Sequence, residues 1–92
     1  MSPGPKTTLD IVGPVCESGD YLALDRSMTM PKQNDLLMIM TAGAYGFSMS
    51  SQYNSRPRVA EVLVSGADAD IIRERETFKD LVRSERIPEF LR

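Results

Sequence analysis

The one cysteine of this chain lies beside a carboxylate, in a loop that is rich in turn-forming residues. Cys16 is followed by Glu17 within the stretch 13–20, which reads GPVCESGD. A thiol at a turn can donate a proton near neutral pH, and a carboxylate can hold a substrate ammonium group. The adjacent carboxylate disfavours the thiolate, so Cys16 is predicted to be a proton donor rather than a nucleophile. The structural alternatives are an inert apolar cysteine and a solvated loop acid. Asp20 is expected to bond backbone N–H groups of its own turn.

A second stretch with chemical potential places a tyrosine between small residues. Tyr45 lies in 43–46, which reads GAYG. Its small neighbours leave space for the hydroxyl to donate a hydrogen bond to a phosphate or carboxylate. The alternative is a half-buried packing tyrosine. Residues 56–58, Arg-Pro-Arg, are a weaker candidate for anion binding, because exposed arginines beside a proline are usually structural.

Composition excludes several classes of site. The absence of histidine removes the usual general base, the commonest zinc ligand and any Ser-His or Cys-His pair. No spacing of potential ligands fits a metal site, so no metal is expected. A net charge of −2 provides no basic face for nucleic acid. Near the C-terminal end, basic and acidic residues alternate along what we expect to be a solvated surface: Arg73, Glu74, Arg75, Glu76, Arg83, Glu85 and Arg86.

The same composition indicates a cytoplasmic protein. A single cysteine cannot form an internal disulfide, which fits a reducing compartment. No apolar stretch reaches the roughly 20 residues of a membrane helix, and the first residues lack the apolar region of a secretory signal. We therefore expect a cytoplasmic protein without membrane partners.

Short strands are predicted to position these residues. The segments with strand-like patterns are 7–12, 21–25, 36–41, 59–64 and 70–75. The last two are expected to form a hairpin around a turn at 65–68. The continuous apolar run 36–41 predicts a strand that is buried on both faces.

The end of the chain has a helical period, with Phe78, Leu81 and Val82 on one face. We therefore predict a mainly β domain over residues 7–92, of barrel or sandwich type, with one short C-terminal helix. Residues 1–6 are expected to be a disordered lead. Five methionines between positions 28 and 49 fit either core filling or an adaptable interface.

Several separated motifs occur in the order known from one enzyme family. The stretches GPVCESGD, TAGAYG, MSSQYNSRPRVAEVLV and RERETFKDLV resemble the C-terminal domain of the diaminopimelate decarboxylases, which are fold-type III pyridoxal-phosphate enzymes. The resemblance runs from about Leu9 to about Val82. Val59 departs from the proline that the family often has after Arg-Pro-Arg.

The resemblance implies roles for three residues. Cys16 matches the proton donor to the decarboxylated carbon. Glu17 matches the acid that recognises the distal amino group of the substrate from across a homodimer. Tyr45 matches the tyrosine that contacts substrate and cofactor phosphate within its own subunit. The implied fold is the β-barrel or sandwich of the alanine racemase and decarboxylase type, and the implied cofactor is pyridoxal 5′-phosphate.

The resemblance covers only the last part of such an enzyme. In the family, a preceding TIM barrel carries the Schiff-base lysine, and Lys6, Lys32 and Lys79 match no cofactor-lysine motif. The barrel is thus expected to be absent from this chain, and the 92 residues alone are expected to be inactive. The expected reaction of the whole enzyme is decarboxylation of meso-diaminopimelate to lysine. Two alternatives stay open: a relative that acts on ornithine, arginine or carboxynorspermidine, and a non-catalytic paralogue that dimerises with and regulates an active enzyme.

Overall fold

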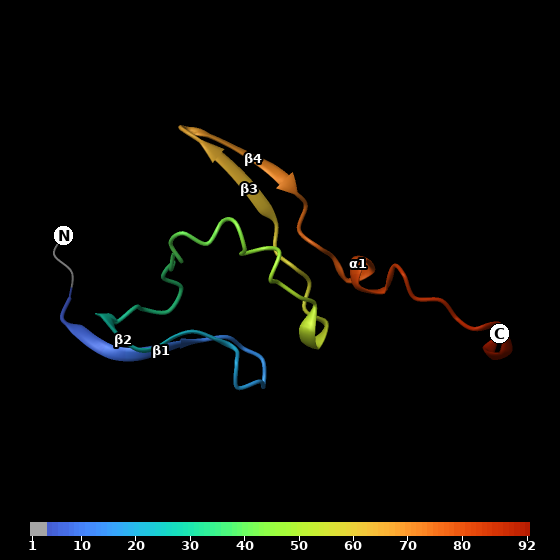
Figure 1. Ribbon diagram of the computed structural model, residues 1–92, viewed down its shortest axis with the longest axis horizontal. Helices are drawn as coiled ribbons and strands as arrows, with labels where there is room; N and C mark the ends of the chain where they lie inside the picture. Colours follow the sequence, from blue (N-terminus) through green and yellow to red (C-terminus); the bar gives the residue numbers. More distant parts are fainter. Residues whose placement is uncertain (1–3) are drawn as a thin grey trace. The chain divides into compact units, whose positions relative to one another are not determined.

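The computed structural model describes residues 4–92, and the first three residues of the predicted lead lie outside the described residues. The chain divides into two compact units, Met1–Met38 and Ile39–Arg92. Each unit contains one two-stranded antiparallel sheet (Figure 1). The described part of the chain is therefore mainly β with little helix, as the sequence predicts.

The first unit is built on the hairpin of β1 (Lys6–Val12) and β2 (Tyr21–Thr29). Both predicted strands are present: β1 begins one residue earlier than predicted, and β2 continues beyond the predicted end, to Thr29. The pairing shifts on either side of Ile11, which marks an irregularity in the ladder. Here Asp25 has a φ of 51° and its backbone N–H donates to Asp10 Oδ1 at 2.7 Å. That side-chain bond satisfies a donor at the point where the ladder is irregular.

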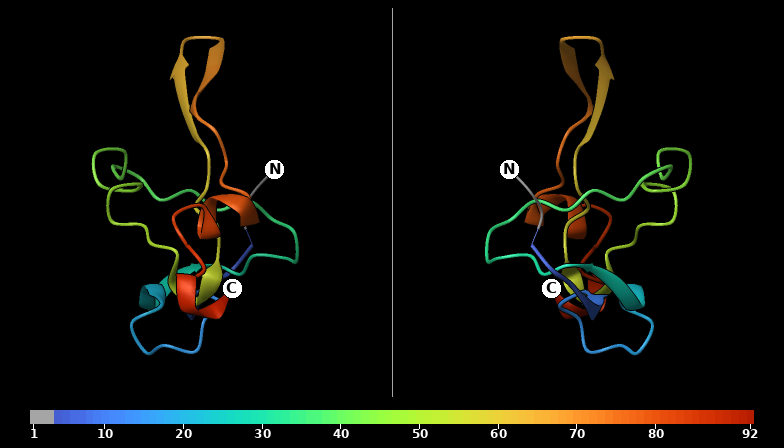
Figure 2. Two further views of the ribbon diagram at one scale, coloured as in Figure 1. Left: turned by 90° about the vertical axis from the view of Figure 1, so that its right-hand side faces the viewer. Right: turned by 90° about the vertical axis from the view of Figure 1, so that its left-hand side faces the viewer.

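The second unit contains the hairpin of β3 (Glu61–Ser65) and β4 (Asp68–Arg73), seen as two adjacent arrows in Figure 2. Its turn has Gly66 at the first loop position with a φ of 60°, a conformation that glycine adopts without a steric penalty. The β-branched residues of both arms favour the extended backbone. The predicted hairpin is confirmed, with each arm displaced by about two residues.

The remaining elements are short. Helix α1 (Phe78–Val82) confirms the predicted C-terminal helix. Its start is stabilised by the Thr77 backbone N–H, which donates to Asp80 Oδ2 at 2.7 Å. Two 3₁₀ turns, η1 (Tyr53–Ser55) and η2 (Glu89–Leu91), complete the described elements.

The prediction of a buried strand at 36–41 is wrong. This segment follows a turn in which the Lys32 N–H donates to Asp35 Oδ2 at 2.7 Å, and it contains no strand. Leu36 is 97% exposed, and Thr41 has a φ of 57°, outside the β region. An apolar run indicates a tendency to be buried, but a strand also needs a hydrogen-bonded neighbour. Within residues 4–92 no strand pairs with this segment.

The described residues lack a hydrophobic core. No apolar side chain within residues 4–92 is buried. Four of the five clustered methionines are more than half exposed, which contradicts core filling for Met30, Met38, Met40 and Met49. A chain of 92 residues that folds alone buries roughly 60–65% of its unfolded surface, largely around such a core. The apolar side chains here therefore remain available for contacts outside this chain.

Candidate functional site

The loop between β1 and β2 presents the predicted thiol at its surface. Cys16 is a free, exposed cysteine. Across the base of the loop, the Gly13 N–H donates to the Asp20 carbonyl at 2.8 Å. The Asp20 carboxylate turns inward and accepts the Val15 N–H at 2.9 Å, which confirms the predicted turn role of Asp20. A Cβ at Gly13 would overlap that carboxylate, so a larger residue there would displace the Asp20 side chain. The loop thus holds the residue next to Cys16 by its backbone and leaves the thiol accessible.

Glu17 folds back on the same loop. Its Oε2 accepts the Gly19 N–H at 2.6 Å, and its Oε1 accepts the Ser18 hydroxyl at 3.4 Å. The Asp20 N–H donates to the Glu17 carbonyl at 3.1 Å. The carboxylate is exposed, and within residues 4–92 its hydrogen-bond donors all belong to its own loop, so it remains accessible to a cation.

Tyr45 lies on a series of tight turns in the second unit, and its side chain is 68% exposed. Its carbonyl accepts the Met49 N–H at 3.0 Å, and the Gly46 N–H donates to the Ala42 carbonyl at 2.8 Å. A Cβ at Gly46 would lie 2.9 Å from the Ala42 oxygen, whereas a Cβ at Gly43 would meet open space. The glycine after Tyr45 thus permits a close backbone approach, and the glycine before the Ala44-Tyr45 pair is not needed for space.

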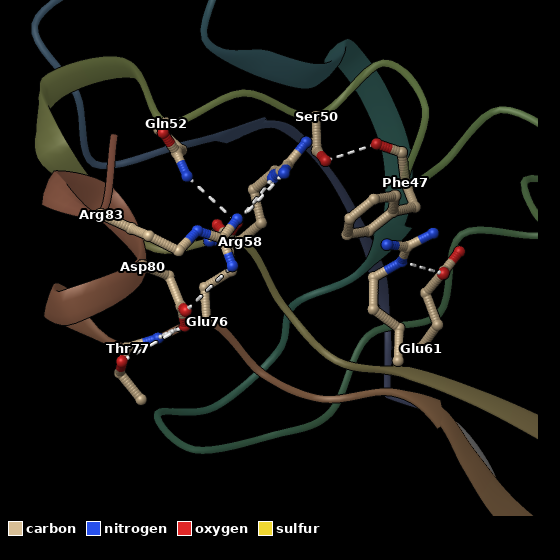
Figure 3. Close-up of polar contacts among 10 residues, drawn as sticks. Phe47, Ser50, Gln52, Arg58, Glu61, Glu76, Thr77, Asp80 and Arg83 are labelled. Atoms are coloured by element: carbon tan, nitrogen blue, oxygen red, sulfur yellow. Dashed lines mark hydrogen bonds and ion pairs between the residues drawn. The ribbon is translucent and has the colours of Figure 1, made fainter. Parts of the chain in front are cut away.

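An ion pair closes the open end of the β3–β4 hairpin. Arg58 and Glu76 lie three residues beyond Glu61 and Arg73, the last pair of the ladder. The Glu76 N–H donates to the Arg58 carbonyl at 3.1 Å, and the Arg58 N–H donates to Glu76 Oε1 at 2.6 Å. Nε and a terminal nitrogen of the Arg58 guanidinium both donate to Glu76 Oε2, at 3.2 and 3.1 Å (Figure 3). The hairpin therefore continues outward through side-chain and backbone bonds.

This pairing changes the acidity of the carboxyl group. The hydrogen bond from the Arg58 side chain, aided by that from the Arg58 backbone, lowers the pKa of Glu76 to about 2. Gln52 Nε2 donates a further bond to Glu76 Oε2 at 3.0 Å. The same contact raises the pKa of Arg58. The expected solvated surface is thus wrong at Glu76, whose side chain is 14% exposed, and Arg58 has a structural partner rather than a free anion site.

A phenylalanine joins this pair to a second one. The guanidinium carbons of Arg58 and Arg73 lie 4.8 and 4.3 Å from the centre of the Phe47 ring. Arg73 Nε also donates to Glu61 Oε2 at 2.6 Å. We call these six residues the Phe47 cluster: Phe47, Gln52, Arg58, Glu61, Arg73 and Glu76. Sequence reasoning missed it, because its members come from three separated segments and no local pattern links them.

The predicted site residues thus occupy two places. Cys16 and Glu17 share one loop of the first unit, and Tyr45 lies on a turn of the second. Within residues 4–92, no three histidine, cysteine or acidic side chains are grouped so that they could hold a metal ion. No helix in the described part of the chain has the length and apolarity required to cross a membrane.

Comparison with known proteins defines the class of domain to which this chain is similar. Residues 1–43 match the family described as the pyridoxal-dependent decarboxylase C-terminal sheet domain. That segment contains the β1–β2 hairpin and the loop with Cys16 and Glu17. The chain is therefore similar to a decarboxylase sheet domain, as the sequence motifs predict.

More specific similarity is to diaminopimelate decarboxylases. The chain is 54% identical to the diaminopimelate decarboxylase of Archaeoglobus fulgidus over 99% of its own length and 22% of that protein. The corresponding enzyme of Methanothermobacter thermautotrophicus is 57% identical over 91% of this chain and 20% of that protein. The chain thus spans about a fifth of the length of these relatives.

Solved structures agree with this similarity. The diaminopimelate decarboxylase of M. jannaschii matches 98% of this chain and 21% of its own, with a TM-score of 0.88 and 39% identity. That of Helicobacter pylori, complexed with L-lysine, matches 90% of this chain and 21% of its own, with a TM-score of 0.80 and 41% identity. The predicted resemblance to the C-terminal domain of diaminopimelate decarboxylase is confirmed.

Proposed function

We propose that this chain acts as the C-terminal sheet domain of a diaminopimelate decarboxylase, which converts meso-diaminopimelate to L-lysine and carbon dioxide. The observation that carries the proposal is 54% identity with such an enzyme over 99% of the chain. The exposed Cys16–Glu17 loop supports it, because a proton donor and an ammonium-binding acid must both be reachable by the substrate.

In this proposal, Cys16 supplies the proton that completes the reaction. After carbon dioxide leaves, the α carbon holds an electron pair and takes the proton from the Cys16 Sγ, which becomes a thiolate. Glu17 holds the distal ammonium group of the substrate and so places the reacting carbon relative to Cys16. Both residues belong to one loop, so the loop geometry fixes their separation.

The proposed cofactor is pyridoxal 5′-phosphate, whose ring withdraws electrons from the α carbon when bound. The exposed hydroxyl of Tyr45 is a suitable donor to its phosphate. Lys6 lies in β1, Lys32 in a turn and Lys79 in α1, and none of the three matches a cofactor-lysine motif. We assign the cofactor lysine to a barrel domain outside this chain. We further propose that the two hairpins form part of a barrel or sandwich, and that the enzyme is a homodimer with shared active sites.

A chimera tests this proposal. The matching segment of the Archaeoglobus fulgidus decarboxylase is replaced by this chain, and carbon dioxide release from meso-diaminopimelate is measured with added pyridoxal phosphate. We expect activity within about tenfold of the parent, a loss of about 1.4 kcal/mol at most. Correct folding of the chimera with no decarboxylation would contradict the proposal, and the same enzyme with its own segment restored is the control.

The substrate choice is tested in the same chimera. Ornithine and arginine also have distal cationic groups, so Glu17 alone does not exclude a relative that acts on them. We expect the highest kcat/KM for meso-diaminopimelate. A higher value for ornithine, arginine or carboxynorspermidine would favour the alternative, and inactivity on all four substrates would favour a regulatory paralogue.

A further inference from the structure

We propose that Phe47, held by Arg58 and Arg73, is a positioning residue for Tyr45, an inference that rests on the proposed role of Tyr45 as a contact for the cofactor phosphate. Phe47 lies two residues after Tyr45 on the same series of turns. It is half-buried, whereas Tyr45 is 68% exposed. The turn thus directs one ring to the hairpin and leaves the other free for a ligand.

The backbone of the turn links the two aromatic residues. The Met49 N–H donates to the Tyr45 carbonyl at 3.0 Å, and the Ser50 N–H donates to the Phe47 carbonyl at 2.9 Å. The Ser50 hydroxyl donates to the same Phe47 carbonyl, as Figure 3 shows. These bonds join residues of the same turn and do not attach the turn to another element. The contact of the Phe47 ring with Arg58 and Arg73 makes that attachment.

The charges around the Phe47 ring favour its contact with the two arginines. An arginine placed over an aromatic face is attracted to the electron-rich ring. Two guanidinium groups close to one ring would repel each other, but each has its own carboxylate, Glu76 for Arg58 and Glu61 for Arg73. Both arginines lie at the open end of the β3–β4 hairpin. The Phe47 cluster therefore joins the Tyr45 turn to the hairpin through a neutral arrangement of charges.

Hydrogen exchange in the chimera tests the physical link. Phe47→Leu removes the aromatic face and keeps an apolar side chain, so amide exchange in residues 42–50 should accelerate about tenfold. Phe90→Leu is the matched control, because Phe90 is 85% exposed and lies in η2. Phe47→Tyr retains the ring and should restore slow exchange. Unchanged exchange in Phe47→Leu would overturn the inference, whether or not the chimera is active.

Cofactor affinity tests whether the link acts through Tyr45. We expect Phe47→Leu and Tyr45→Phe each to weaken pyridoxal phosphate binding several-fold, and the double variant to be no weaker than Tyr45→Phe alone. If the two substitutions weaken cofactor binding independently, their effects will multiply in the double variant. That result would show that Phe47 acts only on stability, and would overturn the inference. Unchanged affinity in Tyr45→Phe would contradict the role of Tyr45 itself and the positioning with it. If the effects of the two substitutions on affinity are coupled in a chimera that does not decarboxylate, the result would support the positioning of Tyr45 by Phe47. It would contradict only the proposed reaction.

Discussion

At the scale of single residues, the chemistry of this chain depends on which carboxylates have partners. Glu76 has an arginine, a glutamine and a backbone N–H around it, whereas Glu17, among the residues that the structure describes, has only donors of its own loop. The partners of Glu76 occupy the hydrogen-bonding positions of its carboxylate, whereas the charge of the Glu17 carboxylate remains at the surface. The motif predicted the candidate Cys16–Glu17 pair because the two residues are adjacent. The partner of Arg58 was not predictable, since its contact with Glu76 depends on the hairpin register.

The Glu76 carboxylate should titrate at unusually low pH. Because the folded-state pKa is lowered from 4.5 to about 2, the pairing stabilises the fold above about pH 4.5. This contribution is lost as the pH falls from about 4.5 towards 2. A carboxyl titration of the chimera, followed by NMR, should therefore give a midpoint near 2 for Glu76, moving towards 4.5 in Arg58→Gln. A midpoint above 4 in the chimera without that substitution would contradict the observed pairing.

At the scale of elements, the sequence pattern predicted the strands, turns and helix that depend on residues close together in the chain. The alternating strands, the Gly66 turn and the helix at Phe78–Val82 are all specified by neighbours in sequence. The strand prediction for the apolar run at 36–41 is wrong because a strand needs a hydrogen-bonded partner, which the sequence pattern does not reveal. The barrel or sandwich closure remains a prediction, and so do the roles assigned to Cys16, Glu17 and Tyr45.

The two glycines around Tyr45 should differ in their tolerance of alanine. Gly46→Ala places a Cβ 2.9 Å from the Ala42 oxygen, so the turn should open more easily by about 1–2 kcal/mol. Gly43→Ala meets open space and should leave the turn unchanged or slightly stabilised. Amide exchange at residue 46 in each variant checks this difference. Equal exchange rates in both variants would contradict the close approach described above.

At the scale of the whole molecule, the exposed apolar side chains dominate the expected behaviour. No apolar side chain within residues 4–92 is buried, although the sequence is 41% hydrophobic. Exposed apolar surface of this kind favours association with other protein surfaces. Composition alone did not predict this, because the same residues could have formed a core of their own.

The isolated 92-residue chain should therefore associate or precipitate. We expect size-exclusion chromatography to show species larger than a monomer, and the chimera to suppress this association by covering the apolar side chains. A stable monomer of the isolated chain across a wide range of concentration would contradict this expectation.

The central claim is that Cys16 delivers the final proton, and one kinetic comparison in the chimera tests it most directly. Cys16→Ala should lower kcat for meso-diaminopimelate by about 10²–10⁴-fold, with KM nearly unchanged, because the thiol acts on the reacting carbon and not on binding. Val15→Ala, a change in the same loop that keeps the backbone N–H bond to Asp20, is the control and should retain near-normal kcat. A Cys16→Ala chimera that keeps kcat within a few-fold of the unmodified chimera would contradict the claim.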